Sequence, residues 1–400
     1  MSTLRKMGVR FPLCLTTIFA TALLNAQPLT WLGVYERGDS VAYGVSLNGS
    51  VVVGSSFDFE QHFAFRWTAS NGMQLINLSS RTGNTYARAV TPDGTIIVGH
   101  DSYFTSYAFY WTPTGLVYLP ELGGWDSGAL AISPDGSVIV GWSKPTGSPQ
   151  VIRAVRWVNG NLSTLGTLGR PFEKATGVSN NGAVIVGWTR EDSPDTRYRA
   201  FRWTAASGMQ DLDLGALSAG NSAAYAITPD GSVIVGYASV GSGDRAFRWT
   251  QATGAQDLGT GIAYAVSADG SVVVGSDPPF RWTAETGRQE LNTLYGHLLS
   301  SGSYFDEAYG VSPDGRYIVG KGYRWETNRF EAFLLDSFAT CATHDGDVDQ
   351  NGCVDDADLL AVLFAFGSTG TNLGRVDINC DESVDDADLL IVLFNFGSGC

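Results

Sequence analysis

The segment Asp269-Gly270-Ser271-Val272-Val273-Val274-Gly275 combines a tight-turn signal, three β-branched residues and a glycine. Asp-Gly and Asn-Gly favour a hairpin, because both residues accept the positive φ of a tight turn. Three consecutive Val or Ile residues predict a strand that is buried on both faces. The pattern occurs seven times, with turn glycines at positions 49, 94, 136, 182, 231, 270 and 315. Residues 31–338 are therefore predicted to consist of repeated units.

Each unit is predicted to contain four short strands. In the first unit these are residues 42–44, 51–53, 64–67 and 73–75, and the third strand ends in a tryptophan. Four strands in about 44 residues predict a mainly β fold with a seven-bladed β-propeller. An open β-solenoid is the alternative, and it would need polar caps. The tryptophans that mark the third strands are Trp67, Trp111, Trp157, Trp203, Trp249, Trp282 and Trp325.

The two ends of the repeat region suggest how the ring closes. Residues 30–33 precede the first unit and look like a stray fourth strand, comparable with residues 257–259. The seventh unit offers two candidates for its third strand, residues 323–325 and 331–334, and no convincing fourth. We therefore expect the N-terminal segment to supply the strand that the last unit lacks.

A family resemblance accompanies these repeats. Residues 246–250 (Ala-Phe-Arg-Trp-Thr), 257–259 (Asp-Leu-Gly) and 265–275 resemble the extracellular repeats called HAF repeats. The resemblance recurs over most of residues 31–338. It implies an exported β-repeat protein, and it brings no catalytic residues with it.

Residues that occur in every unit are interpreted as architecture, and function is expected where the units differ. The third-strand tryptophans and the arginines before six of them are therefore predicted to pack. The residue after the Val-Gly pair is Trp142, Trp188 and Tyr237 in three successive units, which predicts an aromatic platform on one exposed face for a glycan. The alternative for these rings is packing between blades. Those arginines are Arg66, Arg156, Arg202, Arg248, Arg281 and Arg324.

The sequence contains no familiar catalytic motif. There is no Gly-x-Ser-x-Gly elbow and no His-Glu-x-x-His pair, and the four histidines are scattered. We expect a non-enzymatic protein with no catalytic residues. A polysaccharide-acting enzyme is the alternative, because a propeller can gather residues of distant blades around its channel.

The N-terminus is typical of a secretory signal peptide. Arg5, Lys6 and Arg10 precede an apolar stretch at residues 11–24, and Ala26 ends a plausible cleavage site. An uncleaved anchor is the alternative, although the stretch is short for a bilayer span. We expect three parts: a signal at 1–26, the repeat domain at 27–338 and a second domain at 339–400. The mature protein is expected to be secreted or on the cell surface, without a membrane span.

The C-terminal part is strongly acidic, with one basic and twelve acidic residues in positions 341–400. This charge argues against a nucleic-acid partner and favours a cation. Two segments, 347–358 and 377–388, align without gaps and have oxygen side chains at positions 1, 3, 5, 9 and 12, the spacing of a calcium loop. The predicted Ca²⁺ ligands are Asp347, Asp349, Asn351, Cys353, Asp355 and Asp358 in the first loop, and Asp377, Asn379, Asp381, Ser383, Asp385 and Asp388 in the second, with position 7 offering its carbonyl.

Each loop leads into a predicted apolar helix, residues 359–366 and 389–396, followed by a glycine. The arrangement resembles a type I dockerin, which implies calcium binding and docking onto a cohesin-like or envelope scaffold protein. It differs from that family in having Glu382 at the sixth position of the second loop, Asp-Ala at the two partner-reading positions of each loop, and unusually apolar helices. A solvated acidic tail is the alternative.

Four cysteines, at positions 341, 353, 380 and 400, lie in this part of the chain, and in an exported protein they predict two disulfides. Three pairings are possible. Because the termini of dockerin-like modules lie close together, we expect Cys341–Cys400 and Cys353–Cys380.

Two functions fit this sequence. In one, the propeller binds a glycan or surface polymer, and the second domain tethers it to a scaffold. In the other, the protein is a structural component of the cell envelope without a small ligand.

Overall fold

A computed structural model describes most of the chain. The described residues are 28–58, 60–76, 83–102, 104–148, 150–192, 196–241, 243–338, 345–349, 352–369, 373–379 and 383–400. The predicted signal peptide lies outside them. Backbone contacts divide the chain into a unit at Gln27–Ala342 and a second compact unit at Thr343–Cys400.

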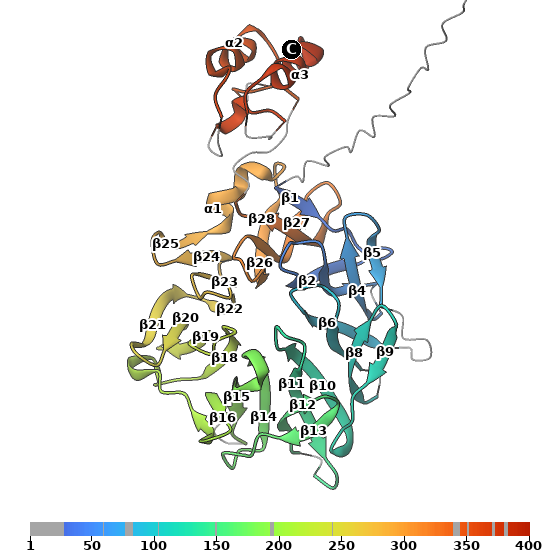
Figure 1. Cartoon of the computed structure of the whole chain (residues 1–400), viewed down its shortest axis with the longest axis vertical. Coiled ribbons are helices and arrows are strands. Elements are labelled where there is room, and N and C mark those ends of the chain that lie inside the picture. The colour runs from blue at the N-terminus through green and yellow to red at the C-terminus, as the bar shows by residue number, and fades with distance from the viewer. Residues whose placement is uncertain are drawn as a thin grey trace, which may run out of the picture. The chain divides into compact units, whose positions relative to one another are not determined.

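The first unit is a seven-bladed β-propeller (Figure 1). Each blade is a four-stranded antiparallel sheet, and its first strand contacts the first strands of both neighbouring blades, all the way round the ring. The first blade consists of β2(Asp39–Val45), β3(Val52–Phe57), β4(His62–Thr68) and β5(Gly72–Leu75). The second consists of β6(Asn84–Val90), β7(Ile97–Ser102), β8(Ser106–Thr112) and β9(Gly115–Tyr118). The third consists of β10(Gly123–Ile132), β11(Val138–Pro145), β12(Arg153–Val158) and β13(Asn161–Thr164). The next three are β14(Phe172–Val178), β15(Val184–Arg190), β16(Tyr198–Thr204) and β17(Gly208–Asp211); β18(Ser222–Ile227), β19(Val233–Val240), β20(Gly243–Thr250) and β21(Gly254–Thr260); and β22(Ile262–Val266), β23(Val272–Ser276), β24(Phe280–Thr283) and β25(Gly287–Glu290).

The seventh blade joins the two ends of the propeller chain. It consists of β26(Tyr304–Val311), β27(Tyr317–Arg324), β28(Arg329–Asp336) and, as its outer strand, β1(Leu29–Trp31). Strand β1 runs antiparallel to β28, with Thr30 opposite Leu334. The predicted closure by the N-terminal segment is confirmed. The open-solenoid alternative is wrong, because β26 contacts β2 and the ring is complete.

The third strand of the last blade corrects one of the repeat markers. The second strand continues to Arg324, and Trp325 lies in the hairpin after it, with 62% of its surface exposed. Residues 331–334 lie in the third strand, and Leu335 is opposite Ile318, where the other blades have tryptophan opposite their Val or Ile. Trp325 is therefore not a repeat tryptophan.

The repeated turns are hairpins, but they are longer than a two-residue turn. All seven turn glycines have positive φ, whereas among the residues before them only Asn181 does. The expectation of two positive-φ residues per turn is therefore wrong at six turns. The aspartate organises the loop instead: Asp269 Oδ1 accepts hydrogen bonds from Ser267 Oγ (2.6 Å) and the Ser271 N–H (3.0 Å).

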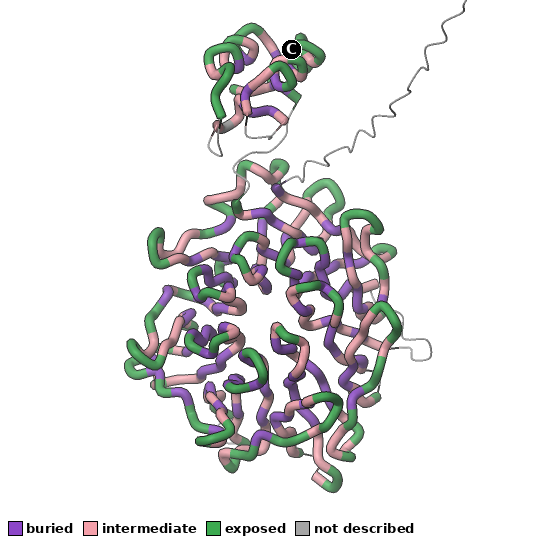
Figure 2. The backbone as a smooth tube through the Cα atoms, in the orientation of Figure 1, coloured by how far each residue is buried: buried purple, intermediate pink, exposed green. Residues whose placement is uncertain are grey.

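The core lies between the blades, where second strands such as β3 and β23 are buried along most of their length (Figure 2). One cluster joins Ala42, Val52 and Phe65 of the first blade to Val319 and Ala332 of the last. Such clusters bury the apolar face that each blade shares with its neighbour, which stabilises the ring.

Hydrogen bonds repeat across the same junctions. The Ala332 N–H donates to Ser40 Oγ (2.8 Å), and the Ala200 N–H donates to Ser222 Oγ (3.0 Å). The predicted packing role of the repeat arginines is confirmed for Arg156, whose guanidinium lies 4.7 Å from the Trp203 ring of the next blade.

The second unit contains two helices, α2(Asp356–Ala365) and α3(Asp386–Asn395). Both begin three residues before the predicted positions, because Asp355 and Asp385 cap them with capping boxes. The other described helices are α1(Leu291–Tyr295) and the 3₁₀ turns η1(Asn180–Gly182), η2(Gly215–Leu217), η3(Gly296–Leu298) and η4(Gly374–Val376). No helix in the described ranges is long and apolar enough to cross a membrane.

Candidate functional site

A β-bulge interrupts the innermost strand of every blade at the same place. In the first blade Ala42 pairs with Gly54 and Gly44 pairs with Val53, so Tyr43 between them has no partner in the ladder. A bulge leaves its extra residue unpaired and bends the strand, which is how a sheet redirects a side chain. The seven bulge residues are Tyr43, Arg88, Leu130, Thr176, Tyr225, Tyr264 and Tyr309.

All seven bulge residues line one cavity at the centre of the ring, with a volume of about 520 Å³. Other parts of the lining come from Lys174 and Trp188 and from three prolines that follow the inner strands: Pro92, Pro134 and Pro313. The cavity is of a size that holds a small ligand or one or two sugar rings. We call it the channel site.

Four tyrosines form a continuous arc along one side of the channel site. The centroid of Tyr264 lies 5.2 Å from that of Tyr225 and 5.0 Å from that of Tyr309, and Tyr43 lies 5.4 Å from Tyr309. These are the distances of favourable aromatic contacts. The arc spans blades five, six, seven and one and offers ring surface to a ligand.

The arc continues into a cation. The guanidinium of Arg88 lies 4.7 Å from the ring centroid of Tyr43 and 4.7 Å from that of Tyr86. Farther round the channel, Lys174 Nζ lies 4.6 Å from the Trp142 ring and 5.6 Å from the Trp188 ring. Both cations are therefore held by aromatic faces.

Burial sets the protonation states around the channel site. It raises the pKa of Tyr264 to about 12 and also raises the pKa of Tyr225 and Tyr309, so these phenols stay protonated at neutral pH. Burial, aided by Arg88, lowers the pKa of Lys174, and it lowers the pKa of His100 to about 3, which makes this imidazole neutral. The Tyr225 and Tyr264 hydroxyls can donate hydrogen bonds to a ligand, whereas the Tyr309 hydroxyl already donates to Glu307 (2.6 Å).

The predicted aromatic platform is not an exposed face. Trp142 is buried, with 7% of its surface exposed, and Trp188 and Tyr237 are half-buried. The Trp142 ring lies against Gly128, where a Cβ would come within 2.6 Å of Trp142 Nε1. Because Gly128 has no side chain, the Trp142 ring can occupy the space above it. The ring therefore lies across the first strand of its own blade and contacts Lys174 of the next blade. Of the three, Trp188 lines the channel site.

Sequence reasoning missed the bulge residues, although a signal was present. The inner strands contain Ala, one variable residue, Gly or Ala, and Val or Ile, as in Ala42-Tyr43-Gly44-Val45 and Ala263-Tyr264-Ala265-Val266. The variable residue is the bulge. The units therefore differ at this residue of the first strand as well as at the residue after the Val-Gly pair on the second strand.

A second candidate site lies at the first loop of the C-terminal unit. Carboxylate oxygens of Asp347, Asp349 and Asp358 lie within 4.8 Å of one another. Asp347 Oδ2 also accepts a hydrogen bond from the Gly352 N–H (3.0 Å), and Gly352 has a φ of 88°. The loop therefore closes on its first residue, and the gathered carboxylates are hard oxygen donors of the kind that Ca²⁺ prefers.

Asp358 also holds the loop backbone in place. It is fully buried and accepts hydrogen bonds from the N–H groups of Val348 (2.6 Å), Asp349 (3.0 Å) and Asp355 (2.9 Å). Asp355 itself caps α2 through the Ala357 N–H (2.8 Å). The predicted ligand Asn351 lies outside the described residues.

The second loop repeats this network. Asp388 is fully buried and accepts hydrogen bonds from the N–H groups of Ile378 (2.6 Å), Asn379 (3.0 Å) and Asp385 (3.0 Å). Asp377 is buried at the start of the loop, and Ser383 forms a bridge with Thr369 of the first half. The predicted ligand Asp381, together with Glu382, lies outside the described residues.

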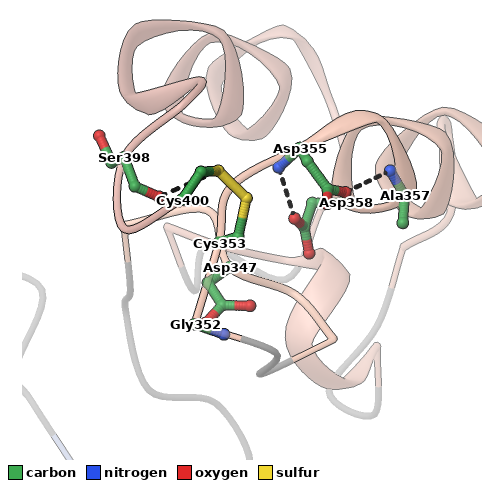
Figure 3. Close-up of a disulfide and its surroundings, with 8 residues drawn as sticks. All are labelled: Asp347, Gly352, Cys353, Asp355, Ala357, Asp358, Ser398 and Cys400. Atoms are coloured by element: carbon green, nitrogen blue, oxygen red, sulfur yellow. Dashed lines mark hydrogen bonds between the residues drawn. A yellow bond between two sulfur atoms is a disulfide. The ribbon is translucent and has the colours of Figure 1, made fainter.

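One disulfide corrects the predicted pairing: Cys353 is bonded to Cys400, with the two Cα atoms 4.6 Å apart (Figure 3). The expected pairs Cys341–Cys400 and Cys353–Cys380 are therefore both wrong. The reason is a backbone contact between the halves, because the Val354 N–H donates to Ser398 O (3.0 Å) and places the chain end beside the first loop. Cys341 and Cys380 lie outside the described residues.

The helices of this unit leave apolar side chains in solvent. Phe364 of α2 is 86% exposed and Phe394, thirty residues later on α3, is 83% exposed. Leu360 and Leu363, and likewise Leu390 and Leu393, are about half exposed beside them. Both helices therefore present apolar side chains that the described residues do not cover.

Comparison with known proteins identifies no family. No family model matches the chain, and no curated protein matches it. The chain resembles the solved structure of TolB from Acinetobacter baumannii, with 17% identity and a TM-score of 0.41, over 53% of this chain and about half (52%) of that protein. It also resembles an oligogalacturonate lyase in complex with manganese (12% identity, TM-score 0.49, 78% of this chain and 92% of that one) and the oligogalacturonate lyase of Vibrio parahaemolyticus (11%, 0.49, 77% and 93%). All three scores are below 0.5, so the propeller assignment rests on the strand pairing of this chain.

Proposed function

We propose that this chain is an exported, non-enzymatic binding protein whose propeller holds a glycan in the channel site and whose C-terminal unit is a calcium-dependent docking module. The tyrosine arc is the observation that carries the first part. Aromatic rings bind sugars by stacking on their C–H faces, and the Tyr225 and Tyr264 hydroxyls supply hydrogen-bond donors at the same surface. The fixed protonation of these phenols suits binding more than proton transfer.

Calcium is proposed at the loops of the C-terminal unit. Asp347, Asp349 and Asp358 fit the ion by their oxygen chemistry and spacing, and the duplicated network around Asp388 supports a second site. The ion would supply positive charge that offsets the mutual repulsion of these carboxylates. A protein partner, cohesin-like or part of an envelope scaffold, would cover the exposed phenylalanines of α2 and α3.

Export is proposed from the N-terminal sequence and agrees with the disulfide. A bond such as Cys353–Cys400 persists in oxidising compartments and is rare in the cytosol. Detection of the chain in culture supernatant or on the cell surface, with Gln27 as the first residue, tests this part. Retention of the full-length chain in the cytosol would contradict it.

A glycan array probed with the full chain tests the central proposal. Binding should be lost in Tyr264→Ala, which removes the middle of the arc, and retained in Tyr107→Ala, which removes a tyrosine that does not line the channel site. Thermal melting confirms that both variants fold. If no glycan binds, or if both variants bind equally, the proposal fails and a structural envelope role becomes the better explanation.

A further inference from the structure

The channel site has a pronounced asymmetry of charge. Its described lining contains two cations, Arg88 from the second blade and Lys174 from the fourth, and no carboxylate. This is unexpected in a chain with a formal net charge of −15. Like charges in a partly buried cavity repel each other, and the repulsion is weakly screened there.

Neighbouring side chains do not neutralise these two cations. Among the described residues neither forms a salt bridge or hydrogen bond, and Arg88 Nε is buried without a hydrogen-bond partner. Their contacts are the faces of tyrosine and tryptophan rings. Asp126 is the acidic group close enough to raise the pKa of Lys174, an effect outweighed by burial and by Arg88.

A lysine elsewhere in the propeller is paired with carboxylates, in contrast to these two cations. Lys321 forms salt bridges with Asp306 (3.0 Å) and Glu307 (2.9 Å), and Glu307 also accepts a hydrogen bond from the Tyr309 hydroxyl (2.6 Å). The Glu307 carboxylate beside the tyrosine arc is thus held by Lys321 and by the Tyr309 hydroxyl. The net positive charge of the channel site lies beyond the Tyr43 end of the arc, on the second and fourth blades.

We infer that the channel site selects an anionic oligosaccharide, one that carries carboxylate or sulfate groups. This inference rests on the proposed function and specifies its ligand. The sugar rings stack on Tyr225, Tyr264 and Tyr309, and the acidic substituents reach Arg88 and Lys174. A guanidinium binds a carboxylate or sulfate through two parallel N–H bonds, and the two terminal nitrogens of Arg88, which form no hydrogen bond with the described residues, are available for both of them.

Isothermal titration of the full chain with three hexasaccharides tests the inference: a neutral glucan, an oligouronate and a sulfated oligosaccharide. The acidic ligands should bind more tightly than the neutral one. Arg88→Gln and Lys174→Gln should each weaken acidic binding about tenfold or more, the usual size of a lost charge-assisted hydrogen bond, and should weaken neutral binding less, so that the preference for the acidic ligands falls. The two acidic ligands show which substituent is preferred.

Arg156→Gln is the matched control. It removes the same charge and also breaks a cation–π contact, but Arg156 lies outside the channel site. Should a channel variant fail to fold, the wild-type chain still provides a test through its dependence on salt. Its affinity for the acidic ligands should decrease when the salt concentration is raised about tenfold, from about 0.05 to about 0.5 M, whereas its affinity for the glucan should not change.

The outcomes separate this inference from the proposed function. Equal binding of neutral and acidic ligands, unaffected by either channel variant and by salt, overturns the anionic selectivity and leaves glycan binding intact. An equal loss in Arg156→Gln also overturns it. The absence of binding to all three hexasaccharides and on the glycan array defeats both.

Discussion

Replacement of Asp358 by alanine should destabilise the C-terminal unit by about 3 kcal/mol in the absence of calcium. The buried carboxylate accepts three backbone N–H groups, from Val348, Asp349 and Asp355. Each group left without an acceptor costs about 1 kcal/mol or more. Asp388→Ala removes an equivalent set of three bonds, so the two variants should lose equal stability when a chelator is present.

Calcium should make the two losses unequal. A bound ion at a hundredfold excess over its dissociation constant adds about 2.7 kcal/mol. Gly352 adopts a φ of 88° at the sharp turn of the first loop, where the second loop has Glu382, a residue that reaches such a conformation at greater cost. The first loop should therefore bind more tightly, and Asp358→Ala should cost more than Asp388→Ala in calcium.

Differential scanning calorimetry of the full chain, in calcium and in chelator, measures both differences. Asp356→Ala is the control, because it removes the same charge from the first turn of α2 at an exposed position without the buried hydrogen bonds. Unequal losses in chelator would refute the hydrogen-bond reasoning. A transition of the C-terminal unit that is the same in calcium and chelator would refute the metal site.

Three further results are expected. Ser40→Ala removes the acceptor at the junction where the ring closes and should lower the free energy of unfolding by about 1–3 kcal/mol, measured by urea titration. Threonine hydroxyls that donate to Asp93 and Asp230 hold the pKa of both carboxyls below the usual 3.8, so their stabilisation is complete above pH 3.8 and is lost as the pH falls below it. Changing both to asparagine should therefore reduce the difference between urea midpoints at pH 7 and pH 3, and an unchanged difference would contradict this. Peptide mapping under non-reducing conditions should recover Cys353 linked to Cys400, and any other partner for either cysteine would show that pairing to be wrong.

The repeat architecture could be predicted because its signals are local. A turn such as Asp269-Gly270 and the Val run after it specify a hairpin within a dozen residues, and seven copies add up to a ring. Closure by the N-terminal segment could also be predicted, since one unit lacked a strand that the other end of the chain possessed. The loop and helix of each half of the C-terminal unit follow from local spacing in the same way, to within three residues.

The channel site depended on tertiary structure, because its seven bulge residues come from seven strands spread between Tyr43 and Tyr309 and meet only when the ring closes. Burial of Trp142 required the space above Gly128, which sequence periodicity does not reveal. Hydrogen bonds between the two halves of the C-terminal unit decided the partner of Cys353. One of them joins Val354 to Ser398, which lie forty-four residues apart in the sequence. Sequence patterns report the backbone conformation of neighbouring residues, whereas side chains from distant segments are brought together by packing that no single segment specifies.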